Sequence, residues 1–164
     1  MPLRAVEALG WGPAEIGLVF TLTGLMTLFT LMPAARAADS IGRRNVILFS
    51  GVAAGVGAII VSQTGSATGF VIGNIVLSLG TGTAGPAPAA YVADIAPPDI
   101  RGLAVAFYRS AGDIGFLAAP PVLGLLAEAT SIPTALGVSG VLVAGAAVVF
   151  LLGTKDDRAA GRQY

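Results

Sequence analysis

Long apolar runs separated by short polar connections dominate the pattern of hydrophobic and polar positions along the chain. The runs are continuous, so they lack the period-two alternation of a half-buried strand or of a membrane barrel. A helix needs about 20 apolar residues to cross a hydrocarbon core of about 30 Å. Five windows meet this requirement, and they predict spans at about 16–35, 46–62, 67–92, 103–127 and 133–153.

We therefore expect an all-α, polytopic transmembrane helical bundle with five spans, forming one transmembrane domain over residues 1–164. Helices satisfy their own backbone polar groups, which lipid cannot do. Composition agrees, because 55% of the residues are hydrophobic and 11% are charged, whereas soluble domains carry about 25% charged residues. The lipid bilayer is thus the predicted surrounding of these helices, with a short polar tail at 154–164.

Two of the four connections are charged, Arg36–Arg44 and Asp94–Arg101, and they predict the orientation. Lysine and arginine mark the cytoplasmic side of membrane proteins. With both charged connections inside, Arg4 is the one basic residue in the connections and termini of the outer side. The inner side holds Arg36, Arg43, Arg44, Arg101, Lys155, Arg158 and Arg162. The N-terminus is predicted to lie outside and the C-terminal tail inside, in the plasma (inner) membrane.

Several classes of chemistry lack the residues they need. The chain has no cysteine and no histidine, which excludes disulfides, thiol catalysis, haem attachment and the usual zinc sites. No glycine-rich phosphate loop precedes a lysine, since the single lysine is Lys155. The chain also lacks a basic patch with interleaved aromatic residues, the pattern that would indicate nucleic-acid binding. We expect a non-enzymatic protein without metal or cofactor.

Arg109 and Asp113 lie within the fourth predicted span, one helical turn apart, so they share a face and can pair. A single charge at a bilayer centre costs about 2.5–3.5 kcal/mol on insertion scales, so both should face the bundle interior or an aqueous cavity. One interpretation is a substrate or proton pathway, in which Asp113 exchanges a proton. The other is a self-neutralised structural pair, with Arg109 reaching about 12 Å back toward the inner surface beside Arg101.

Glycines and prolines add packing signals. Glycines recur at intervals of four, at Gly51 and Gly55 and again at Gly65, Gly69 and Gly73. Small faces let helix backbones approach closely in lipid, and they would also allow helices to slide during gating. Prolines kink helices, and they lie near the end of the third span (Pro86 and Pro88) and inside the fourth (Pro120 and Pro121).

One polar segment carries a resemblance to a known family. The segment Ala35-x-x-x-Asp39-Ser-x-Gly42-Arg43-Arg44 resembles the signature loop of the major facilitator superfamily, Gly-x-x-x-Asp-Arg/Lys-x-Gly-Arg-Arg/Lys. Ala35 replaces the leading glycine and Ser40 replaces a basic residue. Both departures are typical of the weaker copy in the second half of such transporters.

Further along, residues 91–102 and 108–124, which include Tyr-Val-Ala-Asp-Ile-Ala-Pro-Pro and a later Pro-Pro-x-x-Gly, are similar to helices ten and eleven of drug and small-molecule efflux members. The resemblance implies helices eight to twelve of a twelve-helix transporter, with helix seven and the N-terminal half missing. Helices two to six of a first half are the alternative, although the charged tail after the fifth span suits helix twelve better.

The resemblance implies a mechanism, alternating access around a central site, with proton-coupled efflux (antiport) of a small organic or drug-like solute. Asp113 is the one acid well inside a span. The resemblance also implies a conformational charge relay that locks the cytoplasmic side. Its residues would be Asp39, Gly42 for the tight turn, Arg43, Arg44, Asp94, and Arg101 at the inner start of the fourth span. A solvated loop acid is the alternative interpretation of Asp94.

Two other function classes remain to be weighed. The odd number of spans fits a truncated, non-transporting membrane protein that acts as a structural or partner-binding half. An intramembrane enzyme is disfavoured, because the membrane holds no histidine, no cysteine and no carboxylate pair at catalytic spacing. A transporter fragment that needs its missing half is the function we expect.

Overall fold

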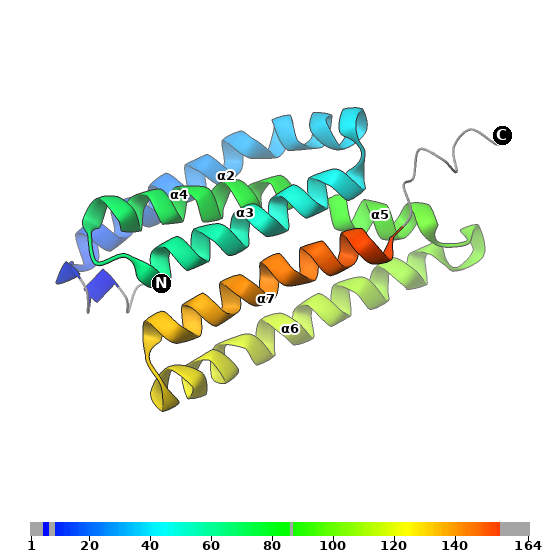
Figure 1. Ribbon diagram of the computed structural model, residues 1–164. Helices are drawn as coiled ribbons and strands as arrows, with labels where there is room; N and C mark the ends of the chain where they lie inside the picture. Colours follow the sequence, from blue (N-terminus) through cyan, green and yellow to red (C-terminus); the bar gives the residue numbers. More distant parts are fainter. Residues whose placement is uncertain (1–4, 7–8, 86, 155–164) are drawn as a thin grey trace.

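The structure, a computed structural model, describes residues 5–6, 9–85 and 87–154 (Figure 1). Within this part of the chain the protein is all-α, which confirms the predicted fold class. Five helical segments are long and apolar enough to cross a membrane. The elements are α2 (Pro13–Ile41), α3 (Arg43–Gln63), α4 (Ala67–Ala84), α5 (Ala87–Ile95), the short 3₁₀ helix η1 (Pro98–Ile100), α6 (Arg101–Ala129) and α7 (Ile132–Gly153).

The helices run up and down as an elongated bundle, with α3 at its centre (Figure 1). α3 packs most extensively against α4 on one side and α7 on the other, and α2 lies against α4 and α3. We call one end of the bundle the Gly42 end, since α2 meets α3 there and α5, η1, the start of α6 and the end of α7 lie at the same end. The opposite end, where Thr64 joins α3 to α4, is the Thr64 end.

The first charged connection is shorter than predicted. α2 continues six residues past the expected end of its span, so that Arg36 and Asp39 are helical and Gly42 is the one residue between α2 and α3. The reason is local, because the alanine-rich stretch 34–38 favours helix and contains no breaker. The polar segment is therefore two more turns of helix followed by a sharp turn.

The third predicted span is two helices. α4 ends at Ala84, Gly85 has a φ of 39° that L side chains rarely adopt, and α5 begins at Ala87. Pro86 lies outside the described residues, as do Arg4, Lys155, Arg158 and Arg162 and the predicted tail from 155 onward. α4 and α5 together are long and apolar enough to count as one membrane span, Ala67–Ile95.

Glycines lie at the closest helix contacts. A Cβ added at Gly51 would meet the Cβ of Ala147 at 2.5 Å, and one at Gly55 would meet the backbone oxygen of Gly140 at 2.5 Å, so both face α7. At the α3–α4 seam the close residues are Gly57, Gly73 and Gly80. Spacing by four thus found the α7-facing pair, but it missed Gly57 and Gly80, whose contacts depend on how α4 crosses α3.

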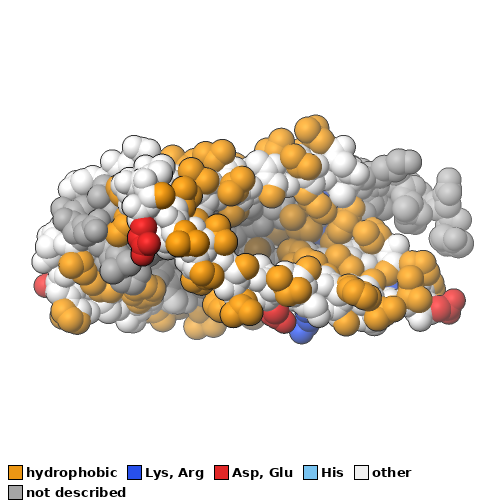
Figure 2. Space-filling view, turned by 90° about the horizontal axis from the view of Figure 1, so that it is seen from below, with side chains coloured by type: hydrophobic (Ala, Val, Ile, Leu, Met, Phe, Trp, Pro, Cys, Tyr) orange, Lys and Arg blue, Asp and Glu red, His pale blue; other side chains and the backbone are white. Residues whose placement is uncertain are grey.

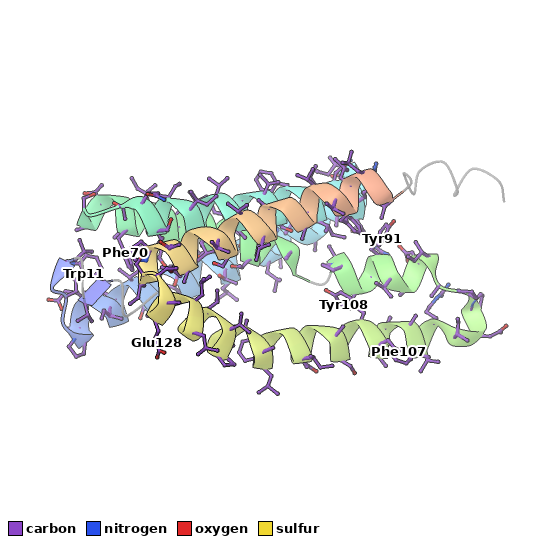
Figure 3. All side chains as sticks on the ribbon, turned by 60° about the horizontal axis from the view of Figure 1, so that its bottom comes forward. Trp11, Phe70, Tyr91, Phe107, Tyr108 and Glu128 are labelled. Carbon is purple, nitrogen blue, oxygen red and sulfur yellow. The ribbon has the colours of Figure 1, made fainter. Side chains whose placement is uncertain are left out.

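α6 is the least covered helix. It packs mainly on its neighbours α5, η1 and α7, and none of its residues is buried. In α3, by contrast, 44% of the most apolar window is buried. Figure 2 looks onto the side of the molecule formed by α6 and shows broad hydrophobic areas with few charged side chains. α6 also bends in its yellow half (Figure 3), and Pro120 and Pro121 lie inside this helix.

Polar side chains inside the helices bond mostly to their own helix. Asn74 donates to the Phe70 carbonyl at 2.9 Å, and Ser78 donates to the Asn74 carbonyl at 2.8 Å. Such bonds to carbonyls one turn back satisfy a buried polar group without a partner helix. At the Thr64 end, Trp11 packs edge-on against Phe70 with ring centroids 5.4 Å apart (Figure 3).

Candidate functional site

The turn at Gly42 places two arginines at the start of α3. Gly42 has φ 94° and ψ 142°, a conformation open to glycine and strained for other residues. Arg43 and Arg44 follow at once as the first residues of α3. Their side chains extend to two different helices, so this turn joins four helix ends at the Gly42 end.

Arg43 connects α3 to α5. Its Nη1 forms an ion pair with Asp94 Oδ2 and donates a hydrogen bond to the Ala90 carbonyl at 3.1 Å. The side chains are 31% and 53% exposed. An ion pair this open to solvent contributes about 0.2–1 kcal/mol, so its value lies in orienting two helix ends more than in stability. It is the one ion pair among the described residues.

We predict a measurable but small coupling between the two partners. Arg43→Gln and Asp94→Asn, combined in a double-mutant cycle, should give a coupling free energy of about 0.2–1 kcal/mol. Chemical unfolding in detergent micelles, followed by circular dichroism, measures it. Asp99→Asn, an exposed acid in η1 at the same end, is the matched control and should show no coupling to Arg43→Gln. Strictly additive effects of the first pair would contradict the contact.

Asp39 lies near this pair without joining it. A small hollow of about 110 Å³ between α2, α4 and α5 is lined by Asp39, Arg43 and several alanines. Asp39 is exposed and forms no ion pair with a described residue. The structure therefore brings Asp39, Arg43 and Asp94 to one place, and two of the three are in contact.

Arg44 reaches α7 and forms no ion pair with an acid among the described residues. Its Nη2 donates to the Leu151 carbonyl, and its Nε donates to Thr154 Oγ1 at 3.0 Å. The last carbonyls of a helix lack intrahelical partners and carry partial negative charge. Arg44 thus caps the C-terminal end of α7, a contact that the sequence did not indicate because carbonyl acceptors leave no trace in residue identity.

Arg101 is the first residue of α6 and is exposed, with no hydrogen bond or ion pair to any described residue. The expected role of Arg101 at the start of this helix therefore rests on its position alone. Because α3 and α6 both begin at the Gly42 end (Figure 1), Arg101 lies at the same end of the bundle as Arg43 and Arg44.

Arg109 and Asp113 are both exposed on α6. Although they are one turn apart, they form no ion pair with each other or with another described residue. Holding two long side chains in one geometry costs conformational entropy, which an exposed pair recovers poorly. Within this chain α6 lies at the edge of the bundle and both side chains are exposed, so the expectation that they face a bundle interior or an aqueous cavity stays a prediction.

This combination defines a class of protein. Five membrane-length helices, locally satisfied polar side chains and arginines at helix ends describe a polytopic, α-helical integral membrane protein. The model of the Major Facilitator Superfamily matches residues 1–163. The chain belongs to this superfamily.

Two curated relatives place the chain within longer proteins. It is 27% identical over 157 residues to an uncharacterized MFS-type transporter of Methanocaldococcus jannaschii, covering 94% of this chain and 41% of the relative. It is 35% identical over 68 residues to myo-inositol transporter 2 of Cryptococcus neoformans var. grubii, covering 42% of this chain and 12% of that protein. The chain thus spans less than half the length of these relatives.

Proposed function

We propose that this chain is the second half, helices eight to twelve, of a secondary transporter that works by alternating access and exports a small organic or drug-like solute in exchange for protons. The family match along 1–163 supports the transporter class. The covered 41% of the methanogen relative is close to half of a two-half transporter. The second relative, named for myo-inositol, supports a small organic molecule as solute.

One observation carries the proposal, the uncovered face of α6. This helix has no buried residue and carries Arg109 and Asp113. Ionisable side chains inside a membrane face a protein interior or a water-filled cavity, because lipid solvates them poorly. The face of α6 therefore suits a cavity wall that an N-terminal half would complete, with Asp113 as its proton carrier.

The Gly42 end is, in this proposal, the cytoplasmic side of the plasma membrane, with the N-terminus outside. Arg43 and Asp94 tie α3 to α5 there, and Asp39 lies at the same hollow. A bond between two helix ends holds one arrangement of those helices. When the two halves rock, Arg43 would exchange its partner Asp94 for Asp39.

Transport should require both halves. In proteoliposomes with an imposed pH gradient, we expect the chain alone to move no ethidium, a drug-like cationic dye. Co-reconstitution with the N-terminal half of the methanogen relative should give pH-gradient-driven dye movement, followed by fluorescence. The N-terminal half by itself is the control.

The outcomes separate the transporter from the alternative, a non-transporting partner-binding half. Stable association of the two halves without movement of ethidium or of myo-inositol would favour the alternative. Transport by the chain alone would contradict the proposal that half of the cavity comes from elsewhere.

A further inference from the structure

A groove of about 510 Å³ lies near the Gly42 end, between α3, α5, α6 and α7. Its volume falls in the range of about 300–1,000 Å³ that is usual for small-molecule sites. Most of its lining is apolar, including Gly51, Pro88, Ile95, Ala146 and Phe150. Figure 3 shows this end of the bundle, where α5 lies between α6 and α7 in that view. Tyr91 belongs to α5, and Tyr108, on α6, lies close to it.

Small residues on α3 and α7 form the base of the groove. A Cβ at Gly51 would meet the Cβ of Ala147 at 2.5 Å, so the two helices touch there. Ala146, the neighbour of Ala147, is exposed and lines the groove. A larger side chain at this position would occupy space that is open in the structure.

Tyr91 supplies the polar feature of this groove. Its side chain is 95% buried, since 5% is exposed, and its ring packs edge-on against Phe150 with centroids 5.2 Å apart. Its hydroxyl has no hydrogen-bond partner in the described part of the chain. Two other hydroxyls that line the groove are bonded, because Ser50 donates to the Ile47 carbonyl at 2.9 Å and Thr154 donates to the Phe150 carbonyl at 2.7 Å. The remaining one belongs to Tyr108, which is 41% exposed and so is not a buried hydroxyl.

Buried hydroxyls in folded proteins are rarely left without a partner, because that is unfavourable, and the residues that the structure describes supply none for Tyr91. A water molecule would satisfy the hydroxyl but would leave the apolar walls wet. A molecule with an apolar body and one oxygen atom would satisfy both the hydroxyl and the walls.

The charges nearby favour a neutral occupant. Arg43 is paired with Asp94, and Arg44 is bound to the Leu151 carbonyl and Thr154. Neither arginine is among the residues that line the groove. No charged side chain lines the groove among the described residues.

We propose that this groove binds a small, neutral amphipathic molecule from the membrane, whose apolar body lies among α3, α5, α6 and α7 and whose single oxygen forms a hydrogen bond with the Tyr91 hydroxyl. The site lies wholly within this chain. It is therefore independent of the proposed transport cavity, which needs a second half, and either can fail without the other.

Photolabelling of the whole chain in detergent micelles tests the site. The probe is an eight-carbon alcohol that carries a diazirine, with unlabelled octanol as competitor and mass spectrometry to locate adducts. We expect saturable adducts on the peptides of α5 and α7 that contain Tyr91 and Phe150. Ala146→Phe, which fills the groove, should lower this labelling more than tenfold.

Tyr91→Phe tests the hydrogen bond while it keeps the ring against Phe150. It should weaken competition by octanol about three- to tenfold, the effect of one hydrogen bond. Ala118→Phe, an exposed position on α6 that does not line the groove, is the matched control and should leave labelling unchanged. Circular dichroism verifies that each variant is folded.

Three results would overturn the proposal. Labelling that octanol does not saturate would show partition into the micelle alone. Equal labelling in wild type and Ala146→Phe would place the probe elsewhere. Unchanged competition in Tyr91→Phe, with labelling lost in Ala146→Phe, would assign the groove to a plain hydrocarbon chain such as a lipid tail.

Discussion

Gly80→Leu should separate α3 from α4 and destabilise the bundle by about 3 kcal/mol or more, the upper range for overpacking. A Cβ at Gly80 would lie 2.7 Å from the Ala54 Cα and 2.7 Å from the Ser50 carbonyl oxygen, so the clash is with backbone that cannot rotate away. Thermal unfolding in detergent micelles, followed by circular dichroism, measures the loss as a lower midpoint or as absence of folded protein.

Gly145→Leu is the matched control for this change. Gly145 is also helical, within α7, and a Cβ there would meet nothing within 4 Å. Leucine is a better helix former than glycine by roughly 0.5–1 kcal/mol, so this variant should be as stable as wild type or more stable. Equal midpoints for Gly80→Leu and wild type would contradict the close α3–α4 seam.

This seam matters because close backbone approach replaces the hydrophobic driving force that lipid removes. α3 carries the close contacts to both neighbours, since Gly57 faces α4 and Gly55 faces α7. Arg43 and Arg44 begin this same helix. The geometry of the arginine contacts therefore depends on how tightly the middle of α3 packs.

The second large effect concerns Asp113. In a transporter assembled with an N-terminal half, Asp113→Asn should reduce pH-gradient-driven transport of ethidium to the level of vesicles without protein. An amide has nearly the shape of the carboxyl group but cannot release a proton, and carboxylates inside membranes commonly serve as proton carriers. Folding should be unaffected, because Asp113 is exposed and forms no ion pair with a described residue.

Two comparisons make this result specific. Asp99→Asn, in η1 outside the apolar spans, should leave transport unchanged. Measuring dye movement down a dye gradient, without a pH gradient, separates coupling from solute binding, and Asp113→Asn should retain it. Unchanged pH-gradient-driven transport in Asp113→Asn would contradict a role as proton carrier. It would favour the interpretation of Arg109 and Asp113 as a structural pair.

The predicted helix boundaries agree with the structure in the last two spans and differ at the first charged connection. The last two spans were predicted at 103–127 and 133–153, and the structure has helices at Arg101–Ala129 and Ile132–Gly153. The charges of the first polar connection, Arg36–Arg44, predict a loop there. In fact Arg36 and Asp39 sit on helix that the surrounding alanines favour, and only Gly42 breaks it.

The amino-acid sequence by itself determined the class of this protein. Continuous apolar runs of membrane length leave a chain no soluble fold, and helices are the local solution for its backbone. The order of residues also placed Arg43 directly after a glycine turn and Asp94 at the end of the third span. In an up-and-down bundle these two positions lie at the same end.

Only the tertiary structure decided which partners meet. The ion pair of Arg43 with Asp94, the contact of Arg44 with the end of α7 and the groove around Tyr91 each join residues more than 40 positions apart. Such contacts depend on how helices cross and on which faces they share, and these follow from the packing of whole surfaces. Residue spacing within one helix carries no record of that packing.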